Sequence, residues 1–388
     1  MTSRERIVRQ LTGRPTDRIP MLGGWMEGAA NLAELGGTTL DAYLADPWAG
    51  VLRANRALHV DGMVPPIVPQ SADEVRSGSL QESSFATVEP EALLERANAT
   101  PDSEAAVLAG FDLATEEANH RRHFEDMLGR LGDIVLIPTL WHVPANFSLY
   151  FEYGYEAFLS ATALYPEAVA KIWWADGVKC RARNRMLVKL FKEYDLVPVL
   201  FCGHDICNGA GPMCSPDFLR RHYWPHVRDS LEPLVAAGIR LVCHCDGNVM
   251  PLIDDFVAAG FSGFQGFQYE CGVDPYRLAA TRGRGGEEPL FFAGLSVSRT
   301  LAFGSEQDVR DEVDYVLDYT GGGRGLFLFT SNVTGVEVPP ANLRAAYAYL
   351  ESLPPPGPRR PAVPRPWPWS VAYPDGRIPL RNQLHRLH

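Results

Sequence analysis

Histidine and aspartate residues follow two consecutive apolar runs of the sequence. The first run ends VLFCGHDIC and places His204 and Asp205 directly after its apolar residues, and the next ends RLVCHCDGN and places His244 and Asp246 at its tip. Imidazole and carboxylate groups that converge on one site can carry out general acid–base catalysis or bind a divalent metal ion. These four residues are therefore the candidate catalytic groups.

The segment around Asp246 also has a structural interpretation. Asp246, Gly247 and Asn248 are all residue types that are common in turns, so Asp246 could simply cap a turn. The similar His204-Asp205 pair one run earlier favours the functional interpretation.

Strand alternation separates the residues of the second run into two faces. One face carries Ile239, Leu241, Cys243 and Cys245, and the other carries Arg240, Val242, His244 and Asp246. Because the first set is apolar or thiol, it suits packing against outer helices. We therefore predict that His244 and Asp246 point into a site, and that Cys243 and Cys245 are buried structural thiols.

Further polar and aromatic residues follow the other apolar runs. They are Trp25 and Glu27 after the first run, Trp141 and His142 after the third, Gln268, Tyr269, Glu270 and Cys271 after the sixth, and Ser331 and Asn332 after the eighth. With Tyr153 they predict an aromatic, mildly acidic pocket, which suits a medium-sized, partly apolar or aromatic substrate better than a polyanion. Three of these residues also have an alternative interpretation without a function in the site. His142 could be a buried structural histidine, Asn332 could simply end its strand, and Glu27 could be a solvated carboxylate.

Eight short apolar runs supply the elements that would position these residues. They span residues 19–23, 62–66, 134–140, 197–202, 239–245, 261–268, 289–295 and 325–330. Amphipathic helical stretches, such as 216–237 and 306–319, lie between them, and this alternation predicts a parallel sheet covered on both faces. Eight such units fit a closed (β/α)8 TIM barrel, in which catalytic residues follow the carboxyl ends of the strands. The alternative is an open doubly wound sheet, but no GxGxxG or GxxxxGK[ST] motif supports a nucleotide-binding version of it.

The 388 residues divide into a barrel over 1–352 and a tail over 353–388. Residues 67–120 are polar and predict a helical insertion after the second strand. The tail begins LPPPGPRRPAVPRPWPW and is too proline-rich for a helix or a central strand, so we expect an extended chain on the surface. Trp367 and Trp369 favour docking of this chain, and disorder is the alternative.

Composition narrows the class of partner and the compartment. The net charge of −11 disfavours an extended nucleic-acid or anionic-membrane surface. No apolar run reaches the length of about 18 residues that a membrane helix needs, and the N-terminal stretch lacks a signal-peptide core. The seven cysteines are odd in number and lie mostly in apolar runs, which disfavours a disulfide framework. We expect a cytoplasmic protein.

Four segments resemble the uroporphyrinogen decarboxylase (URO-D) superfamily. They are MTSRERIVRQLTGRPTDRIPM at the start, GPMCSPDFLRRHYWPHVRDSL, HCDGNVMPLIDDFVAAGFSGFQGFQYECGVDP and SNVTGVEVPPANLRAAYAYL, and the likeness extends over most of residues 1–352. The resemblance implies a (β/α)8 barrel, an activity as a decarboxylase or as a methyltransferase serving corrinoid proteins or thiols, and a homodimer.

The sequence departs from both branches of that superfamily. True uroporphyrinogen decarboxylases carry an arginine-rich first loop, whereas residues 23–31 here contain no Arg or Lys and include Glu27, which would repel a polyanion. Zinc-dependent methyltransferases of the superfamily use a His-x-Cys pair and a distant Cys. Here Asp246 stands at the cysteine position after His244, and residues 335–337 hold no thiol. A rearranged site of His244 and Asp246 with Glu270 or Cys271 would bind zinc or another divalent metal through oxygen ligands.

Three functions follow from this reading. The first is a methyltransferase that moves a methyl group from a small, partly aromatic or apolar substrate to a corrinoid or thiol acceptor, with Asp205, His244 or a metal stabilising the leaving group. The second is a decarboxylase that acts on a smaller carboxylic acid and needs no cofactor. The third is a non-catalytic binding homologue.

Overall fold

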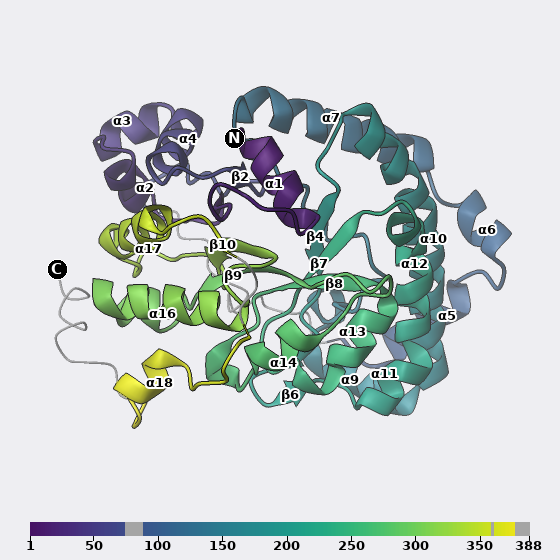
Figure 1. Ribbon diagram of the computed structural model, residues 1–388. Coiled ribbons are helices and arrows are strands. Elements are labelled where there is room, and N and C mark those ends of the chain that lie inside the picture. The colour runs from purple at the N-terminus through teal and green to yellow at the C-terminus, as the bar shows by residue number, and fades with distance from the viewer. Residues whose placement is uncertain (74–87, 358–360, 377–388) are drawn as a thin grey trace.

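The structure is a computed structural model that describes residues 1–73, 88–357 and 361–376 (Figure 1). Each of the eight predicted apolar runs coincides with a strand, and β4 extends one residue beyond its run. These strands are β1 (Leu22–Gly23), β2 (Gly62–Met63), β3 (Val135–Leu136), β4 (Val199–Gly203), β7 (Arg240–His244), β8 (Phe261–Gln265), β9 (Leu290–Leu295) and β10 (Leu326–Thr330). All the pairings among them are parallel, which confirms the α/β class.

The parallel strands form a three-stranded sheet β1-β2-β3 and a five-stranded sheet β10-β9-β8-β7-β4. Single parallel bridges join the edges of the two sheets, Met21 with Leu328 and Thr139 with Phe201. The result is a curled parallel sheet of the kind found in TIM-barrel-like folds. A short antiparallel hairpin that the sequence did not reveal, β5 (Cys207–Asn208) and β6 (Gly211–Pro212), lies in the segment after β4.

Helices surround the curled sheet, with α10 and α12 on one side and α16 and α17 on the other (Figure 1). The helices before β4 are α1 (Ser3–Leu11), α2 (Ala29–Leu35), α3 (Leu40–Ala45), α4 (Pro47–Ala57), α5 (Glu91–Ala99), α6 (Glu104–Ala109), α7 (Leu113–Leu131), α8 (Tyr150–Tyr153), α9 (Tyr155–Leu164) and α10 (Pro166–Glu193). Those after β4 are α11 (Pro216–His222), α12 (Trp224–Ala236), α13 (Ile253–Ala259), α14 (Pro275–Ala280), α15 (Thr300–Phe303), α16 (Glu306–Tyr319), α17 (Pro340–Ser352) and α18 (Pro368–Ala372), with 3-10 turns η1 (Met250–Leu252) and η2 (Tyr269–Cys271). Helices α5 and α6 and the start of α7 fall within the predicted insertion, of which residues 74–87 lie outside the described part of the chain.

Two helix predictions can be compared directly with the structure. The helix over 306–319 is present with the same bounds, begun by a capping box between Ser305 and Asp308. The helical stretch over 216–237 is present as two helices, because the chain breaks at Tyr223 into α11 and α12. Pro225 lacks the N–H that a continuous helix would donate to the carbonyl of Arg221, and its ring would clash there.

The two faces of β7 pack as strand alternation predicts. Val242 belongs to an inner apolar cluster with side chains such as Leu22, Phe201, Phe292 and Phe327 from the other strands. Cys243 and Cys245 are buried in the separate cluster that includes the surrounding helices. All seven cysteines are free thiols.

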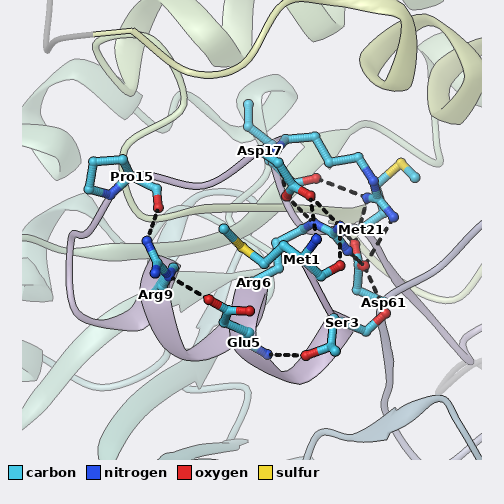
Figure 2. Close-up of polar contacts among 12 residues, drawn as sticks. Met1, Ser3, Glu5, Arg6, Arg9, Pro15, Asp17, Met21 and Asp61 are labelled. Atoms are coloured by element: carbon cyan, nitrogen blue, oxygen red, sulfur yellow. Dashed lines mark hydrogen bonds and ion pairs between the residues drawn. The ribbon is translucent and has the colours of Figure 1, made fainter.

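Polar contacts connect the N-terminal helix to residues that directly precede β1 and β2 (Figure 2). Asp61, which immediately precedes β2, has a fully buried side chain that is bound by both Arg6 and Arg18 and accepts the Met21 N–H at 2.9 Å. Arg6 also forms a two-bond pair with Asp17, and these hydrogen bonds hold the pKa of the Asp17 carboxyl well below its usual range. The network ties α1 to the starts of β1 and β2.

A second contact ties α1 to the far end of the sequence. The buried side-chain amide of Gln10 donates hydrogen bonds of 2.7 Å to the carbonyls of Gly323 and Leu326, the latter being the first residue of β10. Helix α1 therefore joins the first strand of one sheet to the edge strand of the other.

The C-terminal segment corrects one expectation. Residues 361–376 do not stay extended, because Pro368–Ala372 form the short helix α18 beside α16 (Figure 1). Pro368 occupies the first turn, where its missing N–H costs no hydrogen bond. Trp367 and Trp369 are both buried. Among the residues that the structure describes, no helix is both long and apolar enough to span a membrane.

Candidate functional site

Asp205, His244 and Asp246 come together at the carboxyl ends of β4 and β7. The two strands are neighbours, with Gly203 paired with His244, so the residues that follow them meet. One potential ligand atom from each of the three side chains lies within 4.8 Å of the other two, which makes a possible Asp/His/Asp metal-binding group. The close strand approach depends on Gly203, which has a φ of 146° and where a Cβ would lie 2.2 Å from the carbonyl oxygen of His244.

The orientation of His244 follows from its hydrogen bond to Gln265. Nδ1 of His244 lies 2.6 Å from Oε1 of Gln265, and the Gln265 amide nitrogen donates to the carbonyls of Thr330 and Ser331 at 2.8 and 3.1 Å. Since those carbonyls fix the amide nitrogen, the amide oxygen must face the ring, and we assign the hydrogen to Nδ1. The lone pair of Nε2 is then directed toward Asp205, whose Oδ1 is 3.7 Å away.

The two carboxylates are held differently. Oδ1 of Asp205 accepts the backbone N–H of Asp246 at 2.8 Å, and Oδ2 of Asp246 accepts from the side-chain amide of Asn332 at 2.6 Å. Oδ1 of Asp246 is buried and has no hydrogen-bond partner among the described residues. A buried carboxylate oxygen without a donor suits a bound cation, so these residues fit a divalent metal.

The charges of the three side chains shift the pKa values of His244 and Asp246. The pKa of Asp246 is raised to about 6, mainly by burial and also by the charges of Asp205 and Glu270, while His244 and the Asn332 hydrogen bond act in the opposite direction. Burial lowers the pKa of His244, but the two carboxylates and the Gln265 hydrogen bond outweigh that effect, so the pKa is raised. The site therefore stabilises positive charge.

Aromatic rings form one wall beside His244. Trp25 lies with its ring centroid 6.0 Å from that of Trp141 and 5.2 Å from that of Phe201. The His244 ring meets the Trp25 and Trp141 rings edge-on, at 5.6 and 5.7 Å. Trp141 keeps 37% of its surface exposed, so this wall is open to solvent at Trp141 and closed at Phe201.

The loop after β8 approaches the group from another side. Gln268 Oε1 accepts the N–H of Gly247 at 2.9 Å and the thiol of Cys271 at 3.6 Å. Glu270 is bound through Oε1 by the hydroxyls of Ser298 and Ser296. The compact metal-binding group contains Asp205 and includes neither Glu270 nor Cys271, so their role as ligands stays a prediction.

Other predicted site residues are engaged elsewhere. His204 is half-buried, with Nδ1 3.4 Å from the Ser148 hydroxyl, and it lies outside the compact group. Desolvation of its ring lowers its pKa to about 4, so it is neutral at pH 7. The Tyr153 hydroxyl accepts a hydrogen bond from Arg96 at 3.1 Å, and the Tyr269 hydroxyl lies 3.0 Å from that of Tyr319.

Two residues are held through their backbones. The backbone carbonyl of His142 accepts from Arg183 at 2.8 Å, while its side chain is exposed. Glu27 is buried, and its N–H binds the carbonyl of Thr334 at 3.0 Å, so the alternative of a solvated Glu27 is wrong.

Sequence reasoning missed several residues of the site. Gln265 is the residue that orients His244. It could have been recognised as a candidate because it is a polar residue at the end of the strand FSGFQ. Phe201 was hidden because it is apolar like its neighbours in VLFCG. Ser296 and Ser298 follow β9, and no residue after that apolar run was predicted to belong to the site.

The fold is shared with a known enzyme. A methyltransferase from Methanosarcina mazei superposes with a TM-score of 0.56 over 90% of this chain and 98% of its own, at 15% sequence identity. At that identity the likeness describes the fold. No family model and no curated protein matches the chain.

Proposed function

We propose that this chain is a metal-dependent methyltransferase of the URO-D superfamily type. The observation that carries the proposal is the Asp205–His244–Asp246 group beside an aromatic wall, at the carboxyl end of a fold shared with a methyltransferase. The proposal includes a closed (β/α)8 barrel, supported by the bridges that join both pairs of sheet edges.

The substrate we propose is a small, partly aromatic or apolar molecule that carries a methyl group on oxygen or nitrogen. Trp25 and Trp141 would bind its apolar part by ring contacts. The acceptor is the nucleophile of a corrinoid partner protein or a thiol. In the transfer, the bond from methyl carbon to oxygen or nitrogen breaks, its electron pair stays on the leaving group, and the acceptor supplies the pair for the new bond.

The residues of this chain have separate tasks in that reaction. A divalent metal, held by Nε2 of His244 and the carboxylates of Asp205 and Asp246, would act as a Lewis acid toward the leaving group. Gln265 keeps the hydrogen of His244 on Nδ1, and Asn332 fixes one oxygen of Asp246. The buried indole of Trp25 would shield the leaving group from water on the closed side of the wall.

Metal analysis combined with a methyl-transfer assay tests the proposal. We expect about one divalent metal per chain, lost in Asp246→Asn and retained in the surface control Asp133→Asn. With a panel of methyl ethers and methylamines, cob(I)alamin should acquire the absorbance of methylcobalamin. A metal-free protein that transfers no methyl group from any donor would refute the proposal.

The raised pKa of Asp246 favours a second candidate, a decarboxylase that acts on a small acid. In that reaction the bond to the carboxyl carbon breaks, its electron pair stays on the substrate carbon, and Asp246 delivers a proton there. Release of carbon dioxide that Asp246→Asn abolishes would support this alternative over methyl transfer.

A further inference from the structure

Two buried hydroxyl groups from the segment after β3 lead to Asp205. The hydroxyl of Tyr150, the first residue of α8, donates to the backbone carbonyl of Asp205 at 3.1 Å. The Ser148 hydroxyl donates in turn to the Tyr150 oxygen at 3.2 Å, and its own oxygen lies 3.4 Å from Nδ1 of His204. Both Ser148 and Tyr150 are buried, so these contacts are shielded from solvent.

The segment that carries the two hydroxyls is itself held in place. The Tyr150 ring stacks on that of Tyr155, with centroids 4.4 Å apart and an angle of 11° between the ring planes. The Ser148 N–H donates to the side-chain oxygen of Asn146 at 2.8 Å, and the Asn146 N–H donates to Asp176, on α10, at 2.7 Å. The hydroxyl of Tyr150 is therefore presented to Asp205 from a fixed position.

Asp205 lies where no strand holds the backbone. β4 ends two residues before it, and β5 begins two residues after it. Its Oδ1 nevertheless accepts the Asp246 N–H at 2.8 Å and lies 3.7 Å from Nε2 of His244. A hydrogen bond from Tyr150 to the Asp205 carbonyl restrains the backbone from which this carboxylate extends.

We propose that Tyr150 is a positioning residue for Asp205. Together with Ser148 it fixes the Asp205 backbone, so that the carboxylate stays on the Asp246 N–H and next to His244. This inference rests on the proposed metal site and gives the segment after β3 a part in that site, because residues that orient metal ligands from outside strengthen metal binding.

Zn²⁺ affinity of the full-length chain tests the proposal. Tyr150→Phe removes the hydroxyl and keeps the stacked ring, and the affinity, measured by competition with a chromogenic chelator, should fall about tenfold. The control is Tyr347→Phe, which removes a buried hydroxyl that donates to the carbonyl of Leu22 in β1 at 2.6 Å. It should bind Zn²⁺ like the wild type. Equal affinities for the two variants would overturn the proposal.

A double-mutant cycle shows whether the effect passes through Asp205. In an Asp205→Ala background, Tyr150→Phe should cause no further loss of Zn²⁺ affinity. The same loss in both backgrounds would mean that Tyr150 acts on the site in another way, and would overturn the positioning role.

Hydrogen exchange of the metal-free protein separates this inference from the proposed function. The Asp246 amide is donated to Asp205, so its exchange, resolved to single residues, reports the position of that carboxylate. It should be faster in Tyr150→Phe than in the wild type, and unchanged in Tyr347→Phe. An unchanged rate in Tyr150→Phe would overturn the positioning role even if zinc binds. A wild type that binds no Zn²⁺, with faster exchange of this amide in Tyr150→Phe, would refute the metal site and support the positioning of Asp205.

Discussion

Gln265 and His244 form a pair in which one side chain fixes the hydrogen of the other. The amide nitrogen of Gln265 is bound to the carbonyls of Thr330 and Ser331, at the end of β10, so its oxygen can only receive the Nδ1 hydrogen of His244. A histidine held in this way presents Nε2 as a ligand or base. Gly266 contributes to the same geometry, since a Cβ there would lie 2.8 Å from Nδ1.

Replacing Gln265 should weaken metal binding without unfolding the protein. Gln265→Leu removes the acceptor and frees the His244 ring, so we expect the affinity for Zn²⁺ to fall about 10–100-fold. Gln265→Glu keeps an acceptor oxygen, so its affinity for Zn²⁺ should fall less than that of Gln265→Leu. Chelator competition measures the affinity, and circular dichroism checks the fold. A Leu variant with wild-type affinity would mean that the hydrogen bond does not orient the ligand.

Loss of the exposed indole of Trp141 should weaken substrate binding more than metal binding. Trp141→Ala removes a ring that contacts Trp25, Phe201 and His244, and we expect KM for an aromatic substrate to rise about tenfold while the metal content stays the same. Trp48→Ala, in α4, is the control for loss of an indole. An unchanged KM for every aromatic donor would exclude Trp141 from substrate binding.

The buried Glu312 should make stability depend on pH. Burial raises its pKa from an ordinary 4.5 to about 8, so between these values the folded chain keeps a proton that the unfolded chain releases. The free energy of unfolding should therefore fall as the pH rises from about 4.5 to 8, and then level off. Glu312→Gln should remove this dependence on pH. Relative to the wild type, the variant should therefore gain on the order of a few kcal/mol more unfolding free energy at pH 8 than at pH 5.

Urea denaturation at several pH values measures this effect. Glu306→Gln changes an exposed carboxyl of the same helix, in a pair with Arg310, and should leave the slope as it is in the wild type. A Glu312→Gln variant that retains the wild-type slope would show that another group titrates.

The network around Asp61 should contribute far more to stability than a surface ion pair. Asp61→Asn leaves two guanidinium groups, from Arg6 and Arg18, without their buried counter-charge, which we expect to cost about 3–5 kcal/mol of unfolding free energy. Asp133→Asn breaks an exposed pair with Arg56 and should cost less than about 1 kcal/mol. Equal urea midpoints for the two variants would contradict this assignment.

The strands could be predicted because each is a short apolar run, buried on both faces and bounded by turn residues. The positions of His244 and Asp246 followed from the same pattern, since residues after neighbouring parallel strands must meet. The break at Tyr223 could also be predicted from the sequence, because Pro225 interrupts the helical pattern. The helical prediction over 216–237 followed from the spacing of apolar residues, which carries no information about the missing N–H of Pro225.

Contacts between distant parts of the chain could not be predicted, because the local sequence pattern does not indicate them. His204 also follows an apolar run, but it lies one residue beyond the end of β4, whereas His244 is the last residue of β7 and pairs with Gly203. The His204 side chain lies beside Ser148. Trp367 and Glu312 could be recognised as unusual residues, one in a proline-rich tail and one on the buried face of a helix. The surroundings of both residues depend on how α16 packs, which periodicity does not specify.

The bond from Gln10 to Gly323 spans 313 positions of the chain. Helix α1 is synthesised before its polar acceptors, which follow Gln10 by 313 and 316 positions in the chain. Such long-range closure is slow, because the loop entropy must be lost before the contact forms. During translation the amphipathic face of α1, with Ile7 and Leu11, would therefore be exposed to chaperones until those acceptors have been synthesised.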